Sequence, residues 1–182
     1  MGRESTSHVV VTFQFMTNSG FHEFDFLFGK WNVRNKKLVD PTDPKCDDWV
    51  EFVGTIEVIP VLDGWGNIDR FFVPESPEQR AFEGLTFRLF NPSSSVWKIW
   101  WSSTRAPGVL DPPVEGCFVA DQGVFECNDV INGTSVHVRF EWFADVTSPK
   151  WRQSFSWDGG QSWELNWTMD FRPINASASG PH

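Results

Sequence analysis

Asn67 and Asp69 are two polar residues within GWGNIDRFF, a segment whose other members are mostly apolar. Residues two apart in an extended strand point to the same face, so the amide and the carboxylate would lie together. A carboxylate among apolar side chains loses hydration, which favours its neutral form and suits it to general acid or base catalysis. The Asn67 amide could then hold a substrate oxygen. The pair therefore predicts proton transfer by Asp69; the structural alternative is an ion pair of Asp69 with Lys37 or Arg34.

A turn signal places this polar pair in the interior of the protein. Asp63-Gly64 is typical of a two-residue type I′ turn, which would set Leu62 opposite Trp65 and Val58 opposite Asp69. One face of the hairpin is then apolar and consists of Val50, Phe52, Ile56, Val58, Trp65 and Phe71. The other face carries Glu51, Glu57 and Arg70. Because the apolar face must be buried, Asn67 and Asp69 are predicted to point inward.

The stretch SWDGGQSW, residues 156–163, fits the Asp-box pattern of sialidases. In an Asp box the Asp side chain accepts backbone N–H bonds across a hairpin turn and does not contact substrate. Sialidases carry several boxes and an arginine cluster, so glycosidase activity is only a remote alternative here, and Asp158 is interpreted as structural. A turn centred on Gly159 would pair Trp151 with Trp167 and place Gln153 inside. The outward residues would be Arg152, Ser154, Ser156, Glu164, Asn166, Thr168 and Asp170.

Two other strand segments carry reactive side chains. Asp121-Gln122-Gly123 suits a three-residue hairpin loop, which would set Cys117 opposite Cys127. With Cys46 the cysteines are odd in number and form no metal-binding cluster, so we expect reduced thiols and no metal. Alternation on the following strand would turn three side chains toward solvent, namely His137, Arg139 and Glu141.

Charge and motifs exclude several classes of function. The net charge of −9 argues against nucleic acid or an anionic membrane as partner, because both require a basic surface. The chain has no Gly-x-Ser-x-Gly elbow, phosphate loop or dinucleotide fingerprint, so no catalytic triad and no cofactor is expected. It contains 18 Phe and 11 Trp but no Tyr, which favours wide apolar contact. No segment resembles a signal peptide or a membrane span, and we expect a cytoplasmic protein.

Period-two alternation broken by turn residues predicts an all-β protein with about ten antiparallel strands. The expected strands are 30–38, 48–59, 65–73, 84–90, 96–103, 114–120, 124–131, 134–143, 150–157 and 163–171. Strands in simple succession favour an up-and-down barrel, and a short apolar helix over 20–28 would plug one end. Residues 19–173 are expected to form one domain, with tails at 1–18 and 174–182.

The segments GKWNV, GNIDR, GLTFRLFNP and SFSWDGGQSWELNWTMDF, with FDFLF before the first, resemble in their order a group of mostly uncharacterised calycin-like proteins. Gly-x-Trp after a short helix is also the opening of lipocalins. The resemblance implies a barrel that encloses a small molecule, and calycin relatives include cofactor-free cyclases and isomerases. The chain departs from haem-binding nitrobindin-like relatives, because Val33-Arg34-Asn35 follows the Trp in place of a glycine-rich stretch.

These observations predict a calycin-like barrel that binds a small, largely apolar molecule, with or without cofactor-free isomerisation or cyclisation of that molecule. The expected catalytic residues are Asp69 and Asn67. The expected ligand-binding residues are Asn35, Trp65, Phe71, Trp97, Trp101, Trp151, Gln153, Trp167 and Met169. The main alternative is a structural or interaction barrel with a filled core, and haem binding is a minor one. A homodimer is left open.

Overall fold

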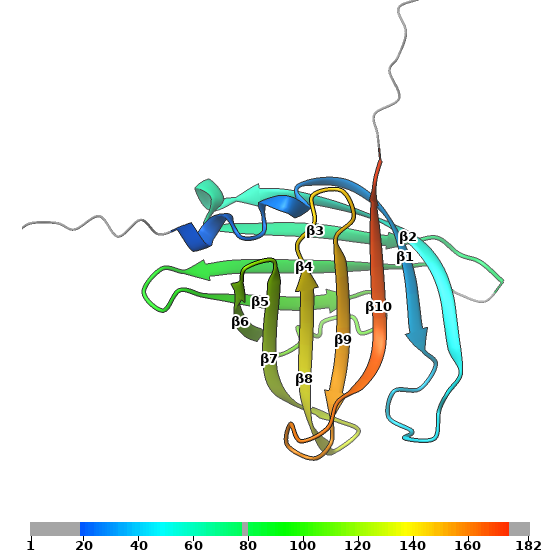
Figure 1. Ribbon diagram of the computed structural model, residues 1–182. Coiled ribbons are helices and arrows are strands. Elements are labelled where there is room, and N and C mark those ends of the chain that lie inside the picture. Colours follow the sequence, from blue (N-terminus) through cyan, green and yellow to red (C-terminus); the bar gives the residue numbers. More distant parts are fainter. Residues whose placement is uncertain (1–18, 78–79, 175–182) are drawn as a thin grey trace, which may run out of the picture.

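The computed structural model describes residues 19–77 and 80–174, and their strands close into a β-barrel (Figure 1). The strands are β1 (Gly29–Leu38), β2 (Trp49–Val61), β3 (Gly66–Val73), β4 (Phe82–Asn91), β5 (Val96–Ser103), β6 (Val114–Val119), β7 (Gln122–Ile131), β8 (Thr134–Phe143), β9 (Lys150–Ser156) and β10 (Glu164–Pro173). Three short 3-10 segments accompany them: η1 (Ser19–His22), η2 (Asp25–Leu27) and η3 (Leu62–Gly64). The predicted tail 1–18 lies outside the described residues, as does the predicted tail 174–182 apart from Ile174.

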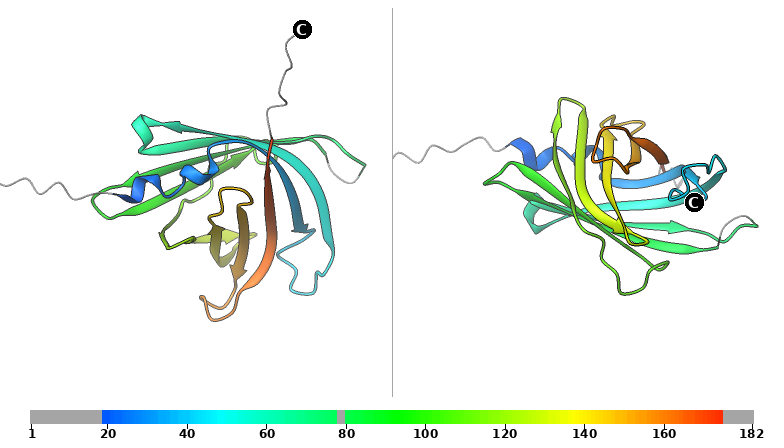
Figure 2. Two further views of the ribbon diagram at one scale, coloured as in Figure 1. Left: turned by 45° about the horizontal axis from the view of Figure 1, so that its top comes forward. Right: turned by 90° about the horizontal axis from the view of Figure 1, so that it is seen from below.

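Each strand pairs antiparallel with the next along the chain, and β1 pairs with β10 to close the barrel. The predicted up-and-down barrel of about ten strands is therefore confirmed. In Figure 1, β3 to β5 run across the direction of β7 to β10, and Figure 2 shows the two groups enclosing a common interior. The β5–β6 seam is the shortest, with three paired positions from Trp97–Gly116 to Ile99–Val114. No helix in the described part of the chain is both long and apolar enough to cross a membrane.

The segment before β1 covers one end of the barrel, here called the plug end. It forms η1 and η2 rather than one helix, and Phe24 and Leu27 are fully buried. Backbone carbonyls of such short 3-10 turns need partners. Two barrel indoles supply them, because Trp97 Nε1 donates to Gly20 O at 3.0 Å and Trp31 Nε1 donates to Leu27 O at 2.7 Å. The plug is thus attached to the barrel by hydrogen bonds as well as by apolar packing.

The β2–β3 hairpin has the predicted register, with Val58 opposite Asp69. Its turn differs from the prediction. Residues 62–65 form a four-residue loop between the paired Val61 and Gly66, closed by a hydrogen bond from Trp65 N to Leu62 O of 3.0 Å. Trp65 therefore leaves the strand, and its ring stacks outside the cavity on Phe21, with ring centroids 4.9 Å apart.

Two predicted hairpin registers are wrong. The β6–β7 turn is a two-residue turn at 120–121, since Val119 pairs with Gln122. Cys117 consequently lies opposite Val124 on the outer face, whereas Cys127 lies opposite Val138 and points inward. All three cysteines are free, as expected.

In the β9–β10 hairpin the turn sets Glu164, rather than Trp163, opposite Phe155, and a β-bulge between Leu165 and Trp167 adds a second one-residue shift. Trp167 therefore lies opposite Gln153 instead of Trp151. The bulge also buries Asn166, which was expected to face outward, and its Oδ1 accepts a 2.8 Å bond from Gln153 Nε2. Ser154 and Ser156 were expected outside as well and are buried. Ser156 is enclosed by the turn, where its Oγ accepts from Gly160 N.

Candidate functional site

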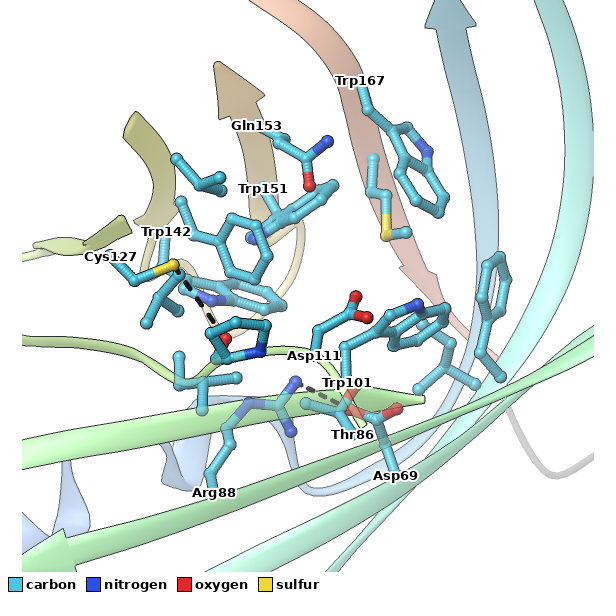
Figure 3. Close-up of a pocket in the computed structure, with 18 of the residues that line it drawn as sticks. Asp69, Thr86, Arg88, Trp101, Asp111, Cys127, Trp142, Trp151, Gln153 and Trp167 are labelled. Carbon is cyan, nitrogen blue, oxygen red and sulfur yellow. Dashed lines mark hydrogen bonds and ion pairs between the residues drawn. The ribbon is translucent and has the colours of Figure 1, made fainter. Parts of the chain in front are cut away.

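The barrel interior contains a cavity of about 220 Å³ (Figure 3). Four indoles line it, and Figure 3 shows them on several walls: Trp101, Trp142, Trp151 and Trp167. Apolar side chains from most strands complete the lining, among them Phe71, Ile99 and Met169. Along each strand of a barrel, inward-pointing residues alternate with outward-pointing ones, so the inward side chains of all strands meet in the interior. The core of the barrel is therefore not completely filled.

A buried ion pair lies in the cavity wall toward the plug end. Arg88 Nη2 is 2.7 Å from Asp69 Oδ2, and the two side chains are only 3% and 2% exposed. Arg88 Nη1 also donates to Asn67 Oδ1 at 2.9 Å. The Arg88 guanidinium lies 5.3 Å from the ring centre of Phe24 and 5.4 Å from that of Trp142. Asp69 thus has the structural ion pair that the sequence left open, with Arg88 in place of Lys37 or Arg34.

Three polar atoms of this wall have no hydrogen-bond partner among the described residues: Asp69 Oδ1, Arg88 Nε and Trp142 Nε1. All three residues line the cavity. An unpaired buried polar group costs on the order of 1–3 kcal/mol, so such groups are normally satisfied by water or by a ligand. One acceptor and two donors are therefore available to a molecule inside the barrel.

The structure brings together most of the predicted ligand-binding residues. Those that line the cavity are Phe71, Trp101, Trp151, Gln153, Trp167 and Met169, and Asp69, predicted as catalytic, lines it as well. Asn67 contacts the site only through Arg88. Asn35 is fully buried and its Oδ1 accepts from Trp167 Nε1 at 3.0 Å, so it orients a cavity residue. Trp97 packs against the plug, and Trp65 lies outside.

Arg88 is the central residue that the sequence analysis missed. On β4 the alternate residues Leu85, Phe87 and Leu89 are apolar, so the pattern favours them as the inward set. The structure has the reverse arrangement, with Thr86 and Arg88 inward. The signal that could have found Arg88 is its register, because it lies directly opposite Asn67 and diagonally from Asp69 on β3.

Charged residues also line the cavity at the end away from the plug, here called the far end. They are Lys37, Asp111 and Asp129. Burial raises the pKa of Asp111, and the charge of Asp129 adds to the rise. Burial, with contributions from Asp129 and Asp111, also raises the pKa of the neighbouring Cys127 thiol to about 11. Because only the thiolate is a strong nucleophile, Cys127 is poorly suited to covalent catalysis.

The two other groups singled out by the sequence lie away from the cavity. His137, Arg139 and Glu141 point to the outer face as predicted. Trp163 packs on two of them, with its ring centre 5.3 Å from that of His137 and 3.6 Å from the Arg139 guanidinium. Asp158 accepts from the backbone N–H groups of Gln161 and Ser162 at 3.0 and 2.9 Å. The Asp box is thus a hairpin turn. Within the described residues no group of His, Cys, Asp and Glu could hold a metal ion.

Comparisons with known proteins support the fold and give no family. Neither a protein-family model nor the sequence of a curated protein matches the chain. Among solved structures, the barrel is similar to the crystal structure of Rv2717c from M. tuberculosis, with a TM-score of 0.58, over 85% of this chain and 96% of that one. The two sequences are 10% identical, so this similarity concerns the fold alone.

Proposed function

We propose that this barrel binds a small, largely apolar molecule in its aromatic cavity, with one polar group of the ligand held beside Arg88 and Asp69. The observation that carries the proposal is the combination of an unfilled interior with buried polar atoms that have no partner. A filled core would have neither feature. The resemblance to calycin-like proteins, which enclose small molecules in such barrels, points in the same direction.

The cavity sets the size and chemistry of the ligand. An apolar cavity of about 150 Å³ already accepts benzene. The larger cavity here therefore suits a compound with one or two rings. Flat indole faces favour an aromatic or otherwise planar apolar skeleton. An oxygen on the ligand could accept from Arg88 Nε or Trp142 Nε1, and a hydroxyl could donate to Asp69 Oδ1.

The geometry favours binding over proton transfer by Asp69. The carboxylate is already engaged by a buried guanidinium, and removal of that partner would leave an unpaired charge in the core. We therefore assign Asp69 and Asn67 to an anchor that orients Arg88. An isomerase or cyclase would need a different acid or base.

The two cysteines on neighbouring strands provide a matched test of ligand binding. Cys127 lines the cavity, whereas Cys117 is exposed on the outer face. Cys127→Phe should fill the cavity, and Cys117→Phe adds the same ring outside. The probe is 2-naphthylmethanol, and the readout is the fluorescence of the cavity indoles.

Wild type and Cys117→Phe should show saturable quenching or a blue shift, and Cys127→Phe should show neither while retaining the circular dichroism spectrum of wild type. Equal responses of the two variants would place the probe elsewhere. No saturation in any of the three proteins would support the filled-core alternative.

A further inference from the structure

Lys37 is an amine inside the cavity. It lies on β1 between Val50 of β2 and Trp167 of β10. Its Nζ is 4.1 Å from the ring centre of Trp167, and that indole is held in place by its hydrogen bond to Asn35. The neighbouring Lys36 points to the outer face, where its Nζ lies 5.1 Å from the ring centre of Trp49. Two adjacent lysines thus have similar aromatic contacts on opposite sides of the barrel wall.

The Lys37 ammonium has no ion-pair partner in the described part of the chain. None of the salt bridges within residues 19–77 and 80–174 includes Lys37. The sequence had suggested Asp69 as its partner, but the Asp69 carboxylate pairs with Arg88. Asp111 and Asp129 line the same cavity, and Glu51 on β2 lies on the outer face. Burial, with a smaller contribution from the positive charge of Arg105, lowers the pKa of Lys37 to about 8. An appreciable fraction of the amine is therefore unprotonated near pH 8, as a nucleophile requires.

We propose that Lys37 forms a reversible Schiff base with an apolar aldehyde or ketone bound in the cavity. The inference rests on the proposed function, because the carbonyl compound must enter the same cavity. It narrows the ligand class to carbonyl compounds and gives the site a covalent step.

The step needs no reactant besides the amine and the carbonyl compound. The Nζ lone pair attacks the carbonyl carbon, the carbon–oxygen π bond breaks, and a proton moves from nitrogen to oxygen to give a carbinolamine. The hydroxyl then leaves as water after accepting a proton, and the nitrogen loses its remaining proton to give the imine. Water is the only by-product.

Asp111 can supply the proton for loss of water. It lines the far end of the cavity together with Lys37, and partial burial and the charge of Asp129 raise its pKa, so that more of its carboxyl is protonated than at the ordinary pKa of an aspartate. A general acid of this kind speeds loss of the hydroxyl group. The proton returns to Asp111 when the imine nitrogen is deprotonated.

The test uses 2-naphthaldehyde as the carbonyl probe and 2-naphthylmethanol as its counterpart that cannot form an imine. The full chain is incubated with a small excess of aldehyde and reduced with sodium cyanoborohydride, and the mass and labelled peptide are determined. Wild type and Lys36→Met should gain one naphthylmethyl group, mapped to residue 37, whereas Lys37→Met should not gain it. The labelling rate should rise as pH increases through about 8.

Failure of this inference and failure of the proposed function give different results. If both probes quench tryptophan fluorescence saturably but the label is absent, or is spread over surface lysines, Lys37 is not a nucleophile and the binding proposal stands. If neither probe saturates, the binding proposal fails as well. Lys37→Arg keeps a cation at the site but cannot form an imine, so a label on that variant would also overturn the inference.

Discussion

At the scale of single residues, the role of each polar side chain in the interior depends on whether it has a partner of opposite charge. Arg88 and Asp69 neutralise each other, while Lys37 lacks an acidic partner at 4 Å or less among the described residues. A paired charge in a core is structural, and an unpaired amine shifts toward its neutral, reactive form. This difference separates the anchor at the plug end from the chemistry proposed at the far end.

Arg88→Met should lower the free energy of unfolding by about 3–5 kcal/mol, because it leaves the buried Asp69 carboxylate without its partner. The measurement is urea denaturation at neutral pH. Arg70→Met is the matched control, since Arg70 pairs with Glu83 on the solvent side and its loss should matter far less. The double variant Asp69→Asn with Arg88→Met should recover part of the loss. Similar losses for the two single arginine variants would contradict a structural role for the buried pair.

At the scale of elements, hairpin turns decide which side chains reach the cavity. The four-residue loop at 62–65 removes Trp65 from the interior, and the two-residue turn at 120–121 separates Cys117 from Cys127. Because side chains alternate along a strand, a one-residue change in loop length reverses the faces of the strand that follows. The plug is the other decisive element, since it seals the end of the barrel next to Arg88.

Phe24→Ala should cost about 3–5 kcal/mol of unfolding free energy, because it deletes a fully buried ring from the plug. Phe24 meets Trp97 and Phe118 edge to face, with centroids 5.0 Å from each. Phe72→Ala is the control, as Phe72 is 41% exposed on the outer face. Urea denaturation of both variants gives the comparison. A loss for Phe24→Ala no greater than that for Phe72→Ala would mean that the plug does not help to stabilise the barrel.

At the scale of the whole molecule, binding and stability should be linked. The proposed ligand occupies a cavity that exists only in the closed barrel, so it binds the folded state and not the unfolded chain. Ligand at a free concentration ten times its Kd then adds roughly 1.4 kcal/mol to the free energy of unfolding.

Addition of 2-naphthylmethanol at this concentration should therefore raise the thermal midpoint of wild type and of Cys117→Phe. The midpoint of Cys127→Phe, whose cavity is filled, should not change. Differential scanning fluorimetry read through the dye signal, rather than through the quenched indoles, measures the effect. An equal rise in all three proteins would indicate binding to the outer surface.

The sequence alone was sufficient for the features that depend on local alternation. Period-two patterning predicted the ten strands, and the apolar face of one hairpin placed Asn67 and Asp69 inside. Most of the aromatic lining followed for the same reason, because every second residue of a strand in a closed barrel must point inward. These predictions need only the distance between residues along one strand.

The tertiary structure decided the features that depend on residues far apart in the chain. Arg88 lies inward although its strand is more apolar on the other face, because diagonal pairing across β3 and β4 brings it to Asp69. Lys37 meets Trp167 only because β1 and β10 close the barrel. The bulge at Asn166 and the length of the β6–β7 loop changed the register of whole strands, whereas the four-residue loop at 62–65 moved Trp65 without changing the register of β2 and β3. An ion-pair partner is selected by register and side-chain reach between strands, and neither is encoded in the alternation along a single strand.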